Sequence, residues 1–214
     1  MRDGSATLRA PVCALAMTHR PQRHSFLVVL SLALFGTGAL AKAIQDENLL
    51  QGLPAGFEVG HQVKRDGLTM VEMVPSGQSV HDWSEMVTTQ IFHGSEDGLD
   101  DYFGEMRGHW SRACDGMTAT PIRDGEEHGY RFALWMFGCP MNPSTGKPET
   151  TWMKGVRGND ALYVVQWAFR REPSEGDVRR SVSYLREVVV CDSRIERSAC
   201  PRVVPEDAAP EGAR

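Results

Sequence analysis

The stretch of sequence that decides the fold is YRFALWMFGC, residues 130–139. Alternate side chains of an extended strand point to opposite faces, and here both faces are apolar. The apolar positions divide into Tyr130, Phe132, Leu134 and Met136 on one face and Ala133, Trp135 and Phe137 on the other. A strand that is apolar on both faces belongs in the middle of a sheet with cover on each side.

Turn signals place this strand within a series of hairpins. Residues 117–139 predict a hairpin whose turn falls at residues 124–129, centred between Glu126 and Glu127. Two more hairpins are predicted from strand-like runs that flank turn residues: 57–63 and 68–74 around Asp66-Gly67, and 150–156 and 161–169 around Gly158-Asn159-Asp160. Strands joined by such tight turns are antiparallel.

Two segments have the spacing of amphipathic helices. The first opens at Asp97 and carries its apolar face on Leu99, Tyr102, Phe103, Met106, Trp110 and Ala113; the second carries its own on Val178, Val182, Leu185, Val188 and Val189. Residues 80–84 predict a turn or one helical turn, and residues 85–92 predict a strand whose first half also fits a helix. The expected fold class is α+β: an antiparallel sheet of about six or seven strands built from hairpins, with one central and one C-terminal helix packed on it.

Residues 25–35, SFLVVLSLALF, form an apolar run that is too short to span a bilayer comfortably. Arg20 and Arg23 precede this run, and Ala39 and Ala41 follow it at the spacing of a signal-peptidase site. The pattern predicts a signal peptide and therefore a periplasmic or secreted bacterial protein.

The predicted organisation follows from this signal. The signal peptide covers residues 1–41, with a cut after Ala43 as the alternative, and we expect Met17 to be the true initiator. A single α+β domain follows at residues 44–192. Residues 193–214 form a tail that is first tied by a disulfide and then, from Pro201, disordered because it is rich in Pro, Ala, Glu and Asp.

Four cysteines remain after the signal peptide: Cys114, Cys139, Cys191 and Cys200. An even number in an exported chain indicates disulfides, with three possible connectivities. The hairpin centred between Glu126 and Glu127 places Cys114 and Cys139 at mirror positions, which leaves Cys191 to pair with Cys200. The full chain has a formal net charge of −5, which argues against nucleic acid as a partner. The sequence contains no second long apolar run, so no membrane span is predicted in the mature form.

Familiar catalytic and cofactor motifs are absent from the sequence. It contains no C-x-x-C, no H-E-x-x-H and no H-x-H. The loop at residues 138–148 has the wrong glycine spacing for a phosphate loop and carries Pro148 where a magnesium-binding hydroxyl belongs. We therefore assign no catalytic, cofactor-binding or metal-binding residues and predict no cofactor.

Several polar groups nevertheless define rival hypotheses. His81, His93 or His128 with nearby carboxylates could form the unfamiliar site of a small periplasmic hydrolase. Met106 and His109 are neighbours on a helix and, with the frequent methionines, suggest metal handling as a third hypothesis. Ser84 beside His81-Asp82, and the acidic clusters at 95–97, 100–101 and 126–128, are interpreted as solvated polar groups.

Residues 83–90, WSEMVTTQ, resemble a W-[ST]-E-M-x-T-x-Q element of uncharacterised exported proteobacterial proteins. The order of elements over residues 53–192 is also similar to PsbP-like domains. That resemblance implies an antiparallel sheet flanked by helices and a non-enzymatic role in binding or assembly. We predict a soluble periplasmic binding or envelope-maintenance protein whose partner is an unidentified envelope ligand or protein. Its binding surface is either the open sheet face or the loop at residues 139–147.

Overall fold

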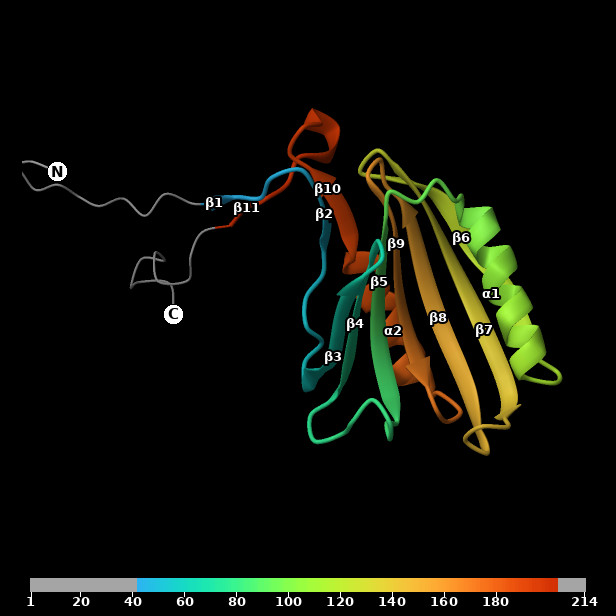
Figure 1. Cartoon of the computed structure of the whole chain (residues 1–214). Coiled ribbons are helices and arrows are strands. Elements are labelled where there is room, and N and C mark those ends of the chain that lie inside the picture. The colour runs from blue at the N-terminus through green and yellow to red at the C-terminus, as the bar shows by residue number, and fades with distance from the viewer. Residues whose placement is uncertain (1–41, 204–214) are drawn as a thin grey trace, which may run out of the picture. The chain divides into compact units, whose positions relative to one another are not determined.

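A seven-stranded antiparallel sheet forms the centre of the fold (Figure 1). The structure is a computed structural model that describes residues 42–203, so the predicted signal peptide, the Met17 start and residues 204–214 lie outside the described part. The strands are β3 (Phe57–Arg65), β4 (Leu68–Pro75), β5 (Glu85–His93), β6 (Thr118–Glu127), β7 (Tyr130–Asn142), β8 (Lys147–Arg157) and β9 (Ala161–Phe169). Their order across the sheet is β3-β4-β5-β9-β8-β7-β6.

Strand β7 contains the two-sided apolar stretch that the sequence places inside a sheet, and it lies between β6 and β8. The first three strands join the last four through β5 and β9, which pair along nine residues from Glu85 opposite Phe169 to His93 opposite Ala161. The predicted fold class, α+β with a hairpin-built antiparallel sheet and two packed helices, is confirmed.

The hairpin turns follow the local sequence. Asp66 and Gly67 both have positive φ, 47° and 77°, as a two-residue hairpin turn requires. The β6–β7 turn lies at His128 and Gly129, which have φ of 49° and 79°. The prediction centred this turn two residues too early, because Glu126 and Glu127 look like turn residues but continue β6.

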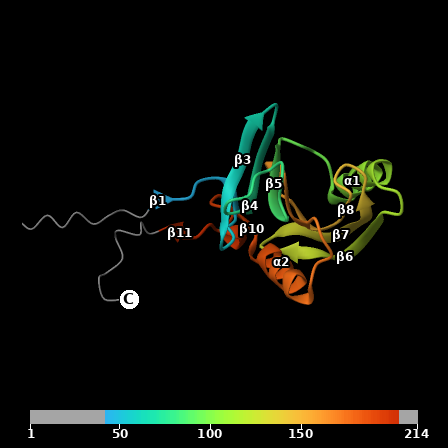
Figure 2. The same cartoon turned by 90° about the horizontal axis from the view of Figure 1, so that it is seen from below.

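The two helices cover opposite faces of the sheet, as Figure 2 shows. Helix α1 (Leu99–Ala113) packs its aromatic residues against Trp135 and Phe137 of β7. Helix α2 (Glu175–Glu187) packs against β8 and β9. It is shorter than its apolar stripe predicts, because Val188 is the C-cap residue and Val189 already belongs to the next strand.

Two short strand pairs accompany the main sheet. Strand β2 (Glu47–Leu50) pairs with β10 (Val189–Asp192), and β1 (Lys42–Ala43) pairs with β11 (Arg202–Val203), just after the 3-10 turn η1 (Glu196–Ser198). The start of the predicted domain therefore contains a paired strand, and so does the described end of the tail. The pairing joins segments far apart in the chain, so no local turn signal announces it.

The disulfides join Cys114 to Cys139 and Cys191 to Cys200. These are the predicted pairs, although the geometry differs from the mirror argument. Cys114 is the C-cap residue of α1 and precedes β6, so the bond ties the end of the helix to β7. Cys191 lies in β10. No helix within residues 42–203 has the length and apolarity needed to cross a membrane.

Candidate functional site

The face of the sheet that carries α1 is only partly covered, and a groove of about 500 Å³ lies beside the helix. Its lining comes from one face of α1, the adjoining strands and the Cys114–Cys139 disulfide: Met106, His109, Trp110, Ala113, Asn142, Glu149 and Gln166. This volume falls within the range of small-molecule sites, about 300–1,000 Å³.

The groove reaches one polar side chain, Gln166, of the otherwise apolar strand β9. Strand β9 reads ALYVVQWAF, and Gln166 is its only amide side chain. The partners of Gln166 across the two neighbouring strands are Thr88 of β5 and Met153 of β8. Directly paired residues in an antiparallel sheet point to the same face, so Thr88 and Gln166 form a polar row on the α1 side.

The walls of the groove combine aromatic and hydrogen-bonding groups. Trp110 packs on Phe137 with 5.5 Å between ring centroids. The neighbouring His109 Nδ1 accepts a hydrogen bond from Arg112 Nη2 at 3.0 Å. On the other side, Asn142 Nδ2 donates to Glu149 Oε2 at 2.9 Å. An indole beside amides and a carboxylate offers a flat apolar surface and nearby groups that can fix a polar ligand's orientation.

The groove unites the two surfaces that the sequence offered as alternatives. Gln166 belongs to the open sheet face, whereas Cys139 and Asn142 belong to the segment at residues 139–147. Sequence reasoning missed Gln166, Glu149 and Trp110. The signal for Gln166 was available, because one amide interrupts an otherwise apolar strand.

The structure does not bring the three candidate histidines together. His81 precedes β5 and His93 ends it, so the strand separates them by about 26 Å. His93 instead lies 2.9 Å from Thr69 Oγ1, measured from its Nε2. His128 lies in the β6–β7 turn, and three strand spacings of the sheet, about 14 Å, separate β5 from β7.

The proposed metal pair has a different setting. Met106 and His109 both line the groove. Within residues 42–203, no group of three or more His, Cys, Asp or Glu side chains is placed to hold a metal ion. Of the acidic clusters, Asp101 closes the start of α1 by accepting from the Gly98 backbone N–H, and Glu127 forms an ion pair with Lys154.

The WSEMVTTQ element has a structural explanation in the packing around the start of β5. Trp83 is buried beneath the Arg170 guanidinium, which lies 3.8 Å from its ring centroid. The Ser84 backbone N–H donates to Gln78 Oε1 at 2.7 Å, which fixes the approach to β5. Gln90, the last residue of the element, accepts a hydrogen bond from Tyr102 of α1.

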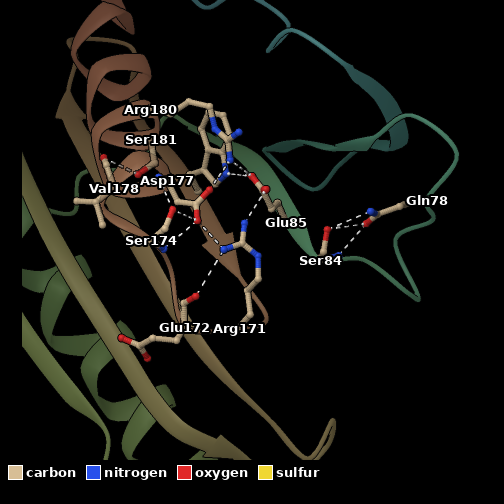
Figure 3. Close-up of polar contacts among 11 residues, drawn as sticks. Gln78, Ser84, Glu85, Arg171, Glu172, Ser174, Asp177, Val178, Arg180 and Ser181 are labelled. Carbon is tan, nitrogen blue, oxygen red and sulfur yellow. Dashed lines mark hydrogen bonds and ion pairs between the residues drawn. The ribbon is translucent and has the colours of Figure 1, made fainter.

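Glu85 is the centre of an ionic network that Figure 3 shows in close-up. Its carboxylate accepts from Arg171 at 3.0 Å, from Arg180 at 2.6 Å and from Trp167 Nε1 at 3.2 Å. Both arginines also donate to Asp177 in the first turn of α2. The network thus joins the start of β5, the end of β9 and the start of α2.

The pKa of Asp177 reflects the hydrogen bonds of this network. The hydrogen bond from Arg171, followed by those from the Ser174 side chain and backbone, holds the pKa of the Asp177 carboxyl well below its usual range. Ser174 is the N-cap of α2, and its hydroxyl accepts from the Asp177 backbone N–H. Two carboxylates balance two guanidinium groups, so we assign this network a structural role rather than a chemical one.

No protein-family model and no curated protein matches this chain. Similar solved structures include the Ran-binding protein Mog1p of Saccharomyces cerevisiae, at 8% identity over 67% of this chain and 85% of the other, with a TM-score of 0.39. LpqN of Mycobacterium tuberculosis, involved in cell envelope biogenesis, is 8% identical over 68% and 84%, with a TM-score of 0.38. PsbP of the cyanobacterium Synechocystis is 11% identical over 72% and 95%, with a TM-score of 0.36. Likenesses this distant transfer no function to this chain.

Proposed function

We propose that this chain is an exported, non-enzymatic binding module that holds an uncharged polar ligand, of the carbohydrate class, in the groove beside α1. The observation that carries the proposal is Gln166, the single amide in the otherwise apolar strand β9, which lines the groove and pairs with Thr88 of β5. An apolar residue at position 166 would suit the sheet equally well, so the amide indicates a ligand rather than a packing need.

The chemistry of the walls supports a neutral ligand with several hydroxyl groups. Trp110 and Met106 offer apolar surface to the carbon face of a sugar ring, while Gln166, Asn142 and Glu149 offer hydrogen-bond partners. The Glu149 carboxylate already accepts a hydrogen bond from Asn142. This bond weakens the preference of Glu149 for a cationic ligand.

Binding suits the groove better than glycoside hydrolysis does. Glycosidases of the ordinary kind use two carboxylates that flank the scissile bond. Among the described residues that line this groove, Glu149 is the only carboxylate. None of the three histidines of the hydrolase hypothesis, His81, His93 and His128, lines this groove.

Export is proposed on the signal-like residues 25–35 together with the two disulfides, which form in oxidising compartments. We also propose that residues 44–192 form a single α+β domain. The segment after it is tied by the disulfide between Cys191 and Cys200. N-terminal sequencing of the protein from the periplasmic fraction is expected to start at Lys42, and a cytosolic, reduced protein would contradict export.

The groove is tested by calorimetric titration of the mature protein with soluble oligosaccharides from the bacterial envelope. Gln166→Ala is expected to weaken binding about threefold to tenfold, which is the loss of one hydrogen bond. Gln62→Ala, on the exposed surface of edge strand β3, is the matched control and is expected to bind normally. Binding of short peptides but not of sugars would reject the carbohydrate class, and turnover of any oligosaccharide would reject a non-enzymatic role.

A further inference from the structure

A second cavity, of about 540 Å³, lies on the opposite face of the sheet, between α2 and the β6–β7 hairpin. Its apolar lining consists of Ile122, Phe132, Leu134, Val182 and Leu185. Its charged lining consists of Lys154, Arg123, Arg186, Glu126 and Glu127. The groove proposed above shares none of these residues.

Lys154 is the unusual residue of this cavity, because a central strand rarely buries an ammonium group. Its side chain is only 4% exposed. The ammonium donates to the Val188 carbonyl at 2.7 Å and forms an ion pair with Glu127. It also lies 5.4 Å from the centroid of the Phe132 ring. Burying an ammonium carries a desolvation cost that an apolar side chain of similar length does not incur, so the choice of lysine here calls for a further explanation.

The hydrogen-bonding capacity of Lys154 is not exhausted by these contacts. An ammonium has three N–H donors, and the Val188 carbonyl and the Glu127 carboxylate account for two. Burial favours the neutral amine and lowers the pKa of Lys154, so a further anionic partner would stabilise its charged form.

The balance of charge around the cavity also favours an anion. Three cationic side chains line it against two carboxylates, and one of these carboxylates is already paired with Lys154. The Arg123 guanidinium lies 6.0 Å from the Phe132 ring centroid, so two of the cations share one aromatic ring. Next to them Ile122 exposes 49% of its surface, which gives the cavity an apolar rim.

We propose that this cavity binds a small amphiphile with a carboxylate head group, of the fatty-acid class. The carboxylate meets Lys154, Arg123 and Arg186, and the hydrocarbon chain lies along Ile122, Leu134 and Val182. Apolar surface and fixed cations in one cavity of this size are what such a ligand requires, since neither a simple anion nor a neutral lipid uses both.

The test uses the mature disulfide-bonded protein and calorimetric titration with decanoate. Decanoate is expected to bind, whereas 1-decanol is expected to bind about tenfold more weakly because it lacks the charge-assisted hydrogen bonds. Acetate, which lacks the chain, and decyltrimethylammonium, which reverses the charge, are expected to show no binding. Equal affinity for decanoate and 1-decanol would overturn the proposal.

Variants on the two arginines keep the test independent of the buried lysine. Arg123→Gln combined with Arg186→Gln is expected to weaken decanoate binding by about tenfold or more while the circular dichroism spectrum is unchanged. Arg179→Gln is the matched control on the exposed side of α2, where the side chain is 73% exposed, and is expected to bind decanoate normally. Unchanged affinity in the double variant, or an equal loss in the control, would refute the assigned head-group site.

A membrane surface offers the same acidic amphiphiles in another form. Sedimentation with phosphatidylglycerol vesicles is expected to leave the protein in solution, because the proposed ligand is a single free molecule. Binding to these vesicles without binding to decanoate would overturn the proposal. The oligosaccharides of the groove are not expected to compete with decanoate, so the two proposals can fail separately.

Discussion

The ion pair between Lys154 and Glu127 makes an asymmetric prediction about stability. The lysine is 4% exposed and the glutamate 24% exposed. Glu127→Gln leaves a buried ammonium without its counter-charge, whereas Lys154→Met leaves a carboxylate that is close to water. Removing one partner of a buried pair costs about 3–5 kcal/mol when the remaining charge has no escape. We expect about 3 kcal/mol for Glu127→Gln, since the Val188 carbonyl still accepts from Lys154.

Lys154→Met is expected to cost less, about 1–2 kcal/mol, mainly because the Val188 carbonyl loses its donor. Methionine is of similar length and keeps the apolar contact with Phe132. The double variant is expected to lie within about 1 kcal/mol of the Lys154→Met variant, because no charge is then stranded. Urea unfolding followed by tryptophan fluorescence measures all four free energies of unfolding.

The pH dependence provides the second half of this test. Burial lowers the pKa of Lys154 from its usual 10.5. Between the lowered value and 10.5 the unfolded chain binds more protons than the folded one, so this group makes stability rise with pH. The stability that Glu127→Gln loses relative to the unchanged protein is therefore expected to become smaller between pH 7 and 9.5. In Lys154→Met the contribution of this group to the pH dependence of stability is absent. A larger loss in Lys154→Met than in Glu127→Gln, or a deficit that is independent of pH, would refute the reasoning.

Three further predictions concern the rest of the fold. Replacing Cys114 and Cys139 by alanine removes a cross-link with a sequence separation of 25 and should lower the free energy of unfolding in urea by about 3.5 kcal/mol; an unchanged midpoint would contradict this. Gly155→Ala places a Cβ atom 2.8 Å from Trp135 and should cost about 1–3 kcal/mol in thermal unfolding, whereas a neutral effect would contradict tight packing of Trp135 at this position. In the folded protein, hydrogen bonds lower the pKa of Asp177, so their contribution is present above about pH 4 and is lost as the pH falls. Asp177→Asn should therefore be less stable at pH 7 and show a smaller further loss in acid, and equal acid slopes would reject this role.

The local part of the fold could be predicted because single short segments encode it. Asp66-Gly67 adopts the two positive φ angles that its residue types favour, so the β3–β4 hairpin needs no distant information. The two-sided apolar stretch at residues 130–139 likewise required an interior strand with cover on both faces, whatever elements supplied that cover. The disulfide pairs followed from the mirror positions of Cys114 and Cys139 about the predicted hairpin, which left Cys191 to pair with Cys200.

The non-local part could not be predicted by the same reasoning. Val188 and Val189 continue the apolar spacing of α2, yet Val189 pairs with Leu50, about 140 residues earlier in the chain. Glu47 shows the same dependence on distant partners, since its carboxylate accepts from the backbone N–H groups of Asn159 and Asp160. Nothing near Glu47 in the sequence reveals these contacts.

The candidate sites were hidden for a related reason. Gln166 interrupts the apolar strand β9, and Lys154 interrupts the buried stretch of β8 from Thr151 to Val156. Whether an interruption faces a groove, a cavity or bulk water depends on where the helices lie across the sheet. That placement is set by packing between Trp135 and α1 on one face and between Trp167 and α2 on the other.

The width of the sheet explains why both faces retain openings. Seven strands span about 29 Å, whereas one helix with its side chains covers about 10 Å. Helix α1 contacts β7 and β8, and α2 contacts β8 and β9, so each helix leaves strips of its own face for other elements to cover. On the α1 side the strip next to the helix contains Gln166, and on the α2 side the strip towards β6 contains Lys154. Apolar residues at both positions would avoid the desolvation of a polar group, which is why these two exceptions are the residues on which ligand binding should be tested.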